Sequence, residues 1–237
     1  MRILGIILSN CLLLSGVISA HSASVKVSPV NIELAAGQNS TSLKLSNDEN
    51  ALVAVQVRIF KWVQQNGQDV LTPTQDVSVS PPFIKMKPKS ENAVRIVRTG
   101  KSPRGGEDSY RVVIDEIPSA ESLKANQVSF VVRQVLPLFF QGQNAPKGAV
   151  DWSAKAQGNG LAITAANSGG RHLKVIDLNI IQKNQTIGSK KGLVGYVLND
   201  SSATWNVPTK GKISKGSVVE LSLKSDREPI NVQVKVD

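Results

Sequence analysis

The sequence contains very little cysteine, histidine or aromatic side chain, and these shortages exclude several kinds of site. Of its 237 residues only one is Cys and two are His, while aromatic residues make up 4%. Cys11 and His21 fall in an N-terminal segment that we expect to be removed, which leaves His172 as the one certain histidine of the mature chain. Disulfides, cysteine nucleophiles and zinc sites built on Cys or paired His are thereby excluded. A lone histidine is more often an ordinary surface or core residue than a catalyst.

The N-terminus has the features of a secretory signal peptide. Arg2 gives it a positive charge, residues 3–18 form a mostly apolar run, and small residues follow at 20–23. We predict a signal peptide over residues 1–22, with cleavage after Ala20 or Ala23 as the alternatives. The run is too short for a comfortable membrane span, and no other stretch approaches membrane length. We therefore expect an exported protein without stable membrane insertion.

The chain is basic, with a formal net charge of +10. A basic exported protein can meet nucleic acid or acidic partners. However, it has no block of five or six basic residues, and base-stacking platforms need aromatic side chains beside the charge. We therefore interpret the charge as solubilising and expect no nucleic-acid partner.

Short β-branched runs between turn signals predict an all-β fold. In the first half, Asn66-Gly67 is a hairpin signal. Pro81-Pro82 marks an edge strand or a kink where the chain switches sheets. Seven strands over about 120 residues are typical of an immunoglobulin-like sandwich, and we place them at residues 25–34, 42–45, 53–63, 77–86, 94–97, 110–114 and 128–140.

A polar stretch rich in Gly and Pro, residues 141–148, is the best domain boundary. After it the strand pattern restarts, at residues 161–165, 173–181, 193–198, 218–223 and 230–236. We predict two β-sandwich domains, an N-terminal one over residues 23–143 and a C-terminal one over residues 144–237.

The titratable residues do not form a recognisable catalytic pattern. Asp115 and Glu116 are adjacent in a strand, so they point to opposite faces and make a poor carboxylate pair. Residues 104–107 have too few glycines, and no following helix, for a phosphate loop. We expect no catalytic residue, no metal site and no cofactor.

The segment 126–140 is long for a strand and apolar on both faces. Such a strand is either central and buried, or an edge that receives a second chain on its open side. Pro137 favours an edge because it has no N–H to donate. One parity of the segment is mostly apolar and is interrupted only by Gln134: Val128, Phe130, Val132, Leu136, Leu138.

The mature chain resembles the periplasmic chaperones of chaperone–usher pili, the PapD-like superfamily. The resemblance rests on the order and spacing of several short stretches: Ser46-Asn47, Ser80-Pro81-Pro82, Glu116-Ile117-Pro118, Leu138-Phe139-Phe140, and Gly195-Tyr196-Val197-Leu198 with Trp205. It implies two immunoglobulin-like domains set at an angle, with a subunit-binding cleft between them. It also implies donor-strand complementation, in which the seventh strand fills the open groove of a pilus subunit before delivery to an outer-membrane usher.

Matching the ends of the seventh strand implies which residues are donated to the subunit. They are Val128, Phe130, Val132 and Leu136, with Gln134 in the same row. Each filled pocket would contribute roughly 1.5–3 kcal/mol of side-chain burial. The implied compartment is the periplasm, and a self-capping dimer of the free protein stays an open alternative.

The sequence departs from the well-known branch of this superfamily and resembles its divergent, archaic-type branch. That branch anchors the subunit's terminal carboxylate with an Arg in the first strand and a Lys late in the seventh. Here Asn31 and Pro137 stand in those regions, and Gln141 replaces an Arg of the inter-domain charge cluster. Arg111 is our candidate anchor because a guanidinium in an apolar strand needs an anionic partner. The weaker candidates are Arg95, Arg133 and Arg58.

Two other classes of protein remain alternatives. A pilus subunit or adhesin would have an incomplete sandwich and a free N-terminal extension, whereas the first domain here counts seven predicted strands. An exported carbohydrate-binding sandwich would need an aromatic platform, whereas Trp62, Trp152 and Trp205 are scattered along the chain.

Overall fold

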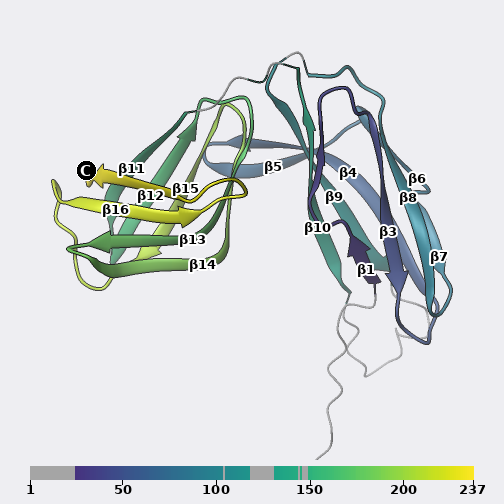
Figure 1. The fold of residues 1–237 in the computed structure, drawn as a ribbon. Helices are drawn as coiled ribbons and strands as arrows, with labels where there is room; N and C mark the ends of the chain where they lie inside the picture. The colour runs from purple at the N-terminus through teal and green to yellow at the C-terminus, as the bar shows by residue number, and fades with distance from the viewer. Residues whose placement is uncertain (1–24, 104, 118–130, 144, 146–148) are drawn as a thin grey trace, which may run out of the picture.

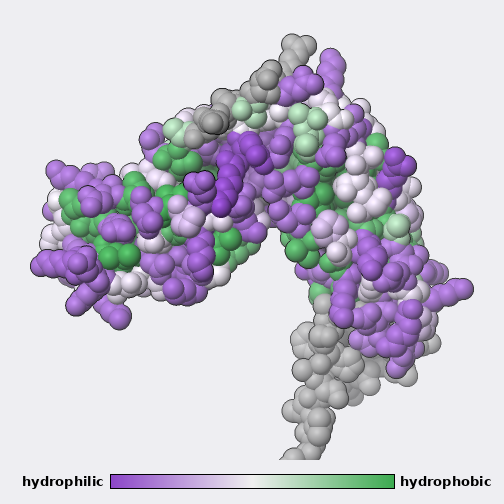
Figure 2. Space-filling model, viewed as in Figure 1, coloured by the Kyte–Doolittle hydropathy of each residue, from purple (hydrophilic) through white to green (hydrophobic). Residues whose placement is uncertain are grey.

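The computed structural model confirms the all-β fold class, with four sheets arranged as two sandwich-like bodies (Figure 1). It describes residues 25–103, 105–117, 131–143, 145 and 149–237. The two bodies lie at an angle to each other (Figure 1), and Figure 2 shows the surface hollowed between them. Within these described ranges, no helix is long and apolar enough to cross a membrane.

The first body packs a four-stranded sheet against a six-stranded one. The smaller sheet has the order β1 (Val25–Ser28), β3 (Ser40–Asn47), β8 (Ser90–Arg98), β6 (Val77–Ser80). The larger has the order β2 (Ile32–Leu34), β10 (Arg133–Gln141), β9 (Glu107–Ile117), β4 (Val53–Gln65), β5 (Gln68–Pro73), and β7 (Phe83–Met86) pairs with the first half of β4.

Two proline signals mark places where the chain changes sheets. The predicted strand 25–34 is in fact two strands: β1 joins the smaller sheet and β2 joins the larger, on either side of Pro29. Pro81-Pro82 separates β6 from β7 in the same manner, which confirms the predicted switch. The hairpin prediction is also confirmed, since Asn66 and Gly67 both have positive φ between the paired residues Gln65 and Gln68.

The alternation of apolar residues places one face of each sheet in the core of the first body. Val55 and Val57 of β4 are 0% and 1% exposed, and they meet Leu43 and Leu45 of β3 in one cluster. Each such side chain contributes roughly 1.5–3 kcal/mol by leaving water. The opposite face of the larger sheet, which carries Arg111, is left to face the second body.

The second body packs a three-stranded sheet against a four-stranded one. The orders are β11 (Val150–Gln157), β12 (Gly160–Asn167), β15 (Ser201–Pro208) and β14 (Gln185–Val197), β13 (Leu173–Gln182), β16 (Val218–Lys224), β17 (Ile230–Lys235). Sequence reasoning missed β11 and β15, because their inward residues include the small Ala154 and Ala203 between polar neighbours. The domain boundary predicted after residue 143 falls between β10 and β11 and stays a prediction.

Candidate functional site

The strand β10 is central along one half and open along the other. It pairs with β9 from Arg133 to Gln141, but with β2 only from Leu138 to Phe140. The ladder to β9 extends one step further, since Glu116 N donates to Val132 O at 3.1 Å. Among the described strands, none pairs with the other side of residues 133–137. This half presents backbone groups that an incoming strand can pair with.

The predicted donor residues have different surroundings. Val128 and Phe130 lie outside the described residues. Val132 is half-buried, and Gln134 Nε2 donates to Val25 O at 2.7 Å. Leu136 is 8% exposed and packs in the core of the first body, and its donation to a subunit stays a prediction. In the free chain its side chain occupies this chain's own core.

The opposite parity of the same strand is more exposed than the sequence reasoning anticipated. Val131 and Val135 are 54% and 44% exposed, on the face that Arg111 shares. Arg111 of β9 lies between Pro137 of β10 on one side and Phe60 of β4 on the other. The apolar residues on both faces of the segment were the sequence signal for these exposed valines. These exposed valines extend the apolar surface beside the open edge.

Arg111 lies where the larger sheet of the first body meets the second body. Its guanidinium carbon is 3.5 Å from the ring centroid of Trp62 and 5.1 Å from that of Tyr196 in β14. Its nearest carboxylate oxygen among the described residues is Asp69 Oδ2, at 3.9 Å, beyond hydrogen-bond distance. The aromatic faces hold the cation in place without using its N–H donors.

The burial of Arg111 leaves its charge poorly compensated. Only 14% of its side chain is exposed, against 50% for Asp69. Burial lowers the pKa of the guanidinium, against the opposing influence of Tyr196 and Asp69, yet an arginine keeps its charge in proteins. A largely buried cation whose N–H donors have no hydrogen-bond partner among the described residues is suited to a carboxylate supplied from outside.

The other candidate arginines are engaged or face elsewhere. Arg58 and Arg133 both bind Asp115, with N–O distances of 2.5 Å each. Burial alone would raise the pKa of Asp115, but the hydrogen bonds from Arg133 and Arg58 outweigh it and lower that pKa. Arg95 lies in β8 of the smaller sheet, where its guanidinium is 3.5 Å from Ser40 Oγ. Glu116, on the other face from Asp115 as predicted, accepts from Val25 N.

Aromatic and polar side chains join the two bodies close to Arg111. Trp62 and Phe139 of the first body form a buried cluster with Tyr196 and Leu198 of the second. Gln64 spans the junction, donating to Tyr196 O at 2.8 Å and accepting from Leu198 N at 2.9 Å. Sequence reasoning missed Gln64, since nothing in a strand pattern distinguishes a bridging glutamine from a solvated one.

The three tryptophans do not form one platform. Trp62 is 1% exposed at the junction, whereas Trp152 and Trp205 lie together in the second body with ring centroids 6.4 Å apart. Trp205 is itself only 9% exposed. The arrangement does not favour the carbohydrate-binding alternative.

Comparisons with known proteins agree with this geometry. Residues 24–146, just over half of the 237-residue chain, match the family described as pili and flagellar-assembly chaperone, PapD N-terminal domain. No curated protein matches the sequence. Among solved structures, the chaperone–tip adhesion subunit complex CsuC–CsuE, from archaic chaperone-usher Csu pili of Acinetobacter baumannii, contains a similar chain with 24% identity and a TM-score of 0.70. That match covers 91% of this chain and 100% of the other.

Two further structures are similar over most of their length. The SafA pilin–SafB chaperone complex of Salmonella enterica gives 19% identity and a TM-score of 0.63, covering 90% of this chain and 98% of that one. The periplasmic chaperone SfaE gives 17% identity and a TM-score of 0.57, covering 90% and 100%. At these identities the likeness shows a shared two-body fold.

Proposed function

The chain belongs to the PapD family of pili and flagellar-assembly chaperones, and from this premise we propose that it binds pilus subunits in the periplasm by lending them its β10 strand. It would then deliver them to an outer-membrane usher. The two-body fold shared with SfaE, which is described as a periplasmic chaperone, supports the compartment. Binding, not bond chemistry, performs this function, so no catalytic group or cofactor is required.

The observation that carries the proposal is the open half of β10. An exposed apolar edge is an aggregation hazard unless another chain pairs with it. Residues 133–137 have one strand neighbour among those described, and Val131 and Val135 beside them are exposed. A subunit strand added here would gain ladder hydrogen bonds. Val128, Phe130 and Val132 share the even-numbered positions of Leu136 in the sequence, and we propose that they enter the subunit's groove.

We propose further that Arg111 binds the terminal carboxylate of the subunit. It stands opposite Pro137, so the anchor and the open edge share one region of the larger sheet. Its position in β9 differs from the first-strand Arg and seventh-strand Lys of the well-known branch. That difference, together with the likeness to the CsuC–CsuE complex of an archaic pilus, supports the archaic-type assignment.

The donor strand is tested with two charge substitutions on one parity. A client is first identified by co-purification from the periplasm and mass spectrometry, and is then co-expressed with each variant. Phe130→Asp should leave the free chaperone folded and abolish client recovery, because an unpaired carboxylate cannot enter an apolar groove.

Leu136→Asp is the matched control. It places the same charge in the chaperone's own core, so it should unfold the free protein. Loss of folding in Phe130→Asp, or full client recovery by it, would refute the donor assignment.

A further inference from the structure

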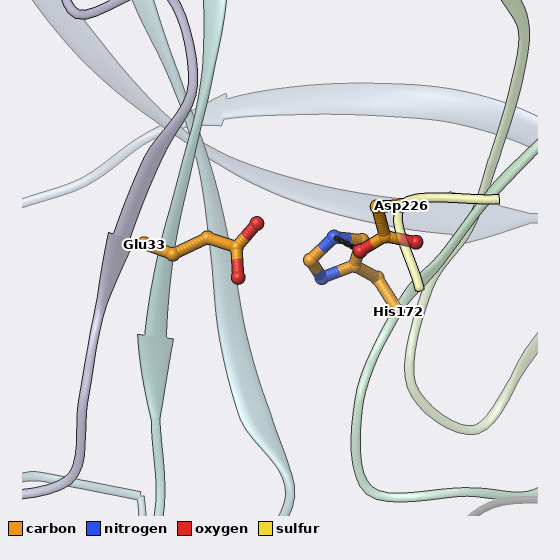
Figure 3. Close-up of side chains that lie close together, drawn as sticks. All are labelled: Glu33, His172 and Asp226. Atoms are coloured by element: carbon orange, nitrogen blue, oxygen red, sulfur yellow. Dashed lines mark ion pairs between the residues drawn. The ribbon is translucent and has the colours of Figure 1, made fainter. Parts of the chain in front are cut away.

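One imidazole lies between carboxylates at the junction of the two bodies. His172 stands just before β13, Glu33 lies in β2, and Asp226 lies between β16 and β17. One ligand atom of each lies within 4.8 Å of the others. Figure 3 shows the carboxylates of Glu33 and Asp226 beside the ring of His172. The three residues come from both bodies, so the cluster exists only when the bodies are in contact.

One ring nitrogen of His172, Nδ1, is paired with the buried carboxylate of Glu107. Nδ1 lies 2.7 Å from Glu107 Oε1, and the two side chains are 1% and 0% exposed. The ring is stacked on Phe139, with centroids 3.6 Å apart and planes at 9°. A carboxylate oxygen accepts from a ring N–H, and in the tautomer that carries this proton on Nδ1 the lone pair of Nε2 is free. This is the outer-partner arrangement that orients a metal-binding histidine and directs the lone pair of its Nε2 outward.

The spacing between Nε2 and Asp226 Oδ2 fits a metal better than a hydrogen bond, whereas Glu33 lies farther off, within 4.8 Å, and would move in to complete the site. Nε2 is 3.6 Å from Asp226 Oδ2, whereas N–H···O bonds are about 2.7–3.2 Å long. Two ligands bound to one tetrahedral zinc at about 2.0–2.2 Å lie roughly 3.3–3.5 Å apart. Asp226 Oδ1 accepts from Lys174 N at 3.4 Å, which leaves Oδ2 directed at the ring.

The surrounding charges leave room for a cation. Glu33, Glu107 and Asp226 approach the imidazole. Arg171 binds Glu33 Oε2 at 3.2 Å, and Arg227 donates to His172 O at 3.2 Å. Glu33 Oε1 also accepts from Asn31 Nδ2 at 2.8 Å. A carboxylate has about four acceptor positions, so these two contacts leave positions on Glu33 for a metal. One imidazole nitrogen and two carboxylates are a ligand set that zinc accepts, with water in the fourth position.

We propose that Glu33, His172 and Asp226 form a zinc site that fastens the two bodies together. Glu33 belongs to β2, whose ladder with β10 covers the central half of the donor strand. Zinc bound there would hold β2, and through it the closed half of β10, against the second body. It would thereby fix the angle at which Arg111 and the open edge face a subunit.

The test uses mature, tag-free protein stripped with a chelator, because a histidine tag would itself bind zinc. Titration calorimetry with ZnCl₂ should show one site per chain, and MgCl₂ should show none. Asp226→Asn and Glu33→Gln should each weaken zinc at least tenfold. Asp48→Asn is the matched control. Asp48 is an exposed carboxylate that pairs with Lys26 and is not one of the three proposed ligands, so this variant should bind zinc as the wild type does.

A second measurement on the wild type uses His172, the one histidine certain to remain in the mature chain. Long-range ¹H–¹⁵N spectra report both ring nitrogens, and zinc should shift the Nε2 signal while Nδ1 keeps its proton. If both nitrogens carry protons at pH 7 and zinc moves neither signal, the cluster is an imidazolium ion pair and the zinc site is refuted. Equal zinc affinity in Asp226→Asn and the wild type would refute it as well.

Discussion

Replacing Arg111 by alanine tests the anchor most directly. The guanidinium is 14% exposed, covers Trp62, and has its nearest carboxylate oxygen at 3.9 Å. Removing one partner of a buried, hydrogen-bonded charge pair costs about 2–5 kcal/mol. Arg111→Ala should therefore raise the Kd for a subunit by roughly thirtyfold to several thousandfold.

The same substitution has a smaller cost in the free protein. The stacked cation contributes about 0.5–2 kcal/mol to the contact with Trp62, and 1 kcal/mol shifts Tm by about 2–4 °C in a protein of this size. Arg111→Lys keeps the cation but not the planar fork, so it should restore stability more than affinity. Arg133→Ala removes an arginine that is 62% exposed and already bound to Asp115, and it should change affinity much less.

The assay compares a client ending in a free carboxylate with the same client amidated at its C-terminus. Wild type should bind the amidated client poorly, whereas Arg111→Ala should bind the two forms equally. The reasoning is wrong if amidation weakens both proteins by the same factor. In that case another residue reads the carboxylate, and Arg133 would be examined next.

Four further outcomes are expected. The N-terminal sequence of the exported protein should begin between His21 and Ser24, and a periplasmic chain that still starts at Met1 would contradict this. A reductant should not change the stability of the mature protein, because the mature chain lacks Cys. Gln64→Ala should remove two hydrogen bonds across the junction, about 1 kcal/mol each, measured as a lower urea midpoint than in an exposed Gln68→Ala control. The pKa of Asp115 is lowered in the folded state, so its ion pairs stabilise the fold above the unfolded pKa of about 3.9 and are lost as pH falls further. Asp115→Asn should therefore lose less stability than wild type between pH 6 and pH 3, and an equal loss would contradict the assignment.

The sequence predicts this fold well where alternation is strong and proline marks a boundary. The buried valines of β4 and the turn at Asn66-Gly67 are found where the pattern places them. The pattern fails where inward positions are filled by small residues, as at Ala203 in β15, because alanine gives little hydrophobic contrast. Alternation alone does not show that residues 25–34 cross between sheets; Pro29 and the shift of the apolar residues from odd to even positions are the available signal.

The candidate site is predictable only in part. An arginine within an apolar strand is a visible anomaly, and Arg111 indeed lies at the junction of the bodies. The contacts of His172 depend on residues that are 65 and 54 positions away in sequence, Glu107 and Asp226. Local patterns carry no information on such contacts, because they arise from how two separately folded bodies meet.

The open half of β10 reconciles two conflicting demands. In the proposed function it pairs with a subunit strand, yet an apolar open edge also invites association with any other edge. Pro137 removes an N–H donor where the edge becomes central, so strand addition is favoured on the residues before it. A subunit bringing a carboxylate to Arg111 gains a contact that a second copy of this edge does not supply, and this difference favours the client over self-association.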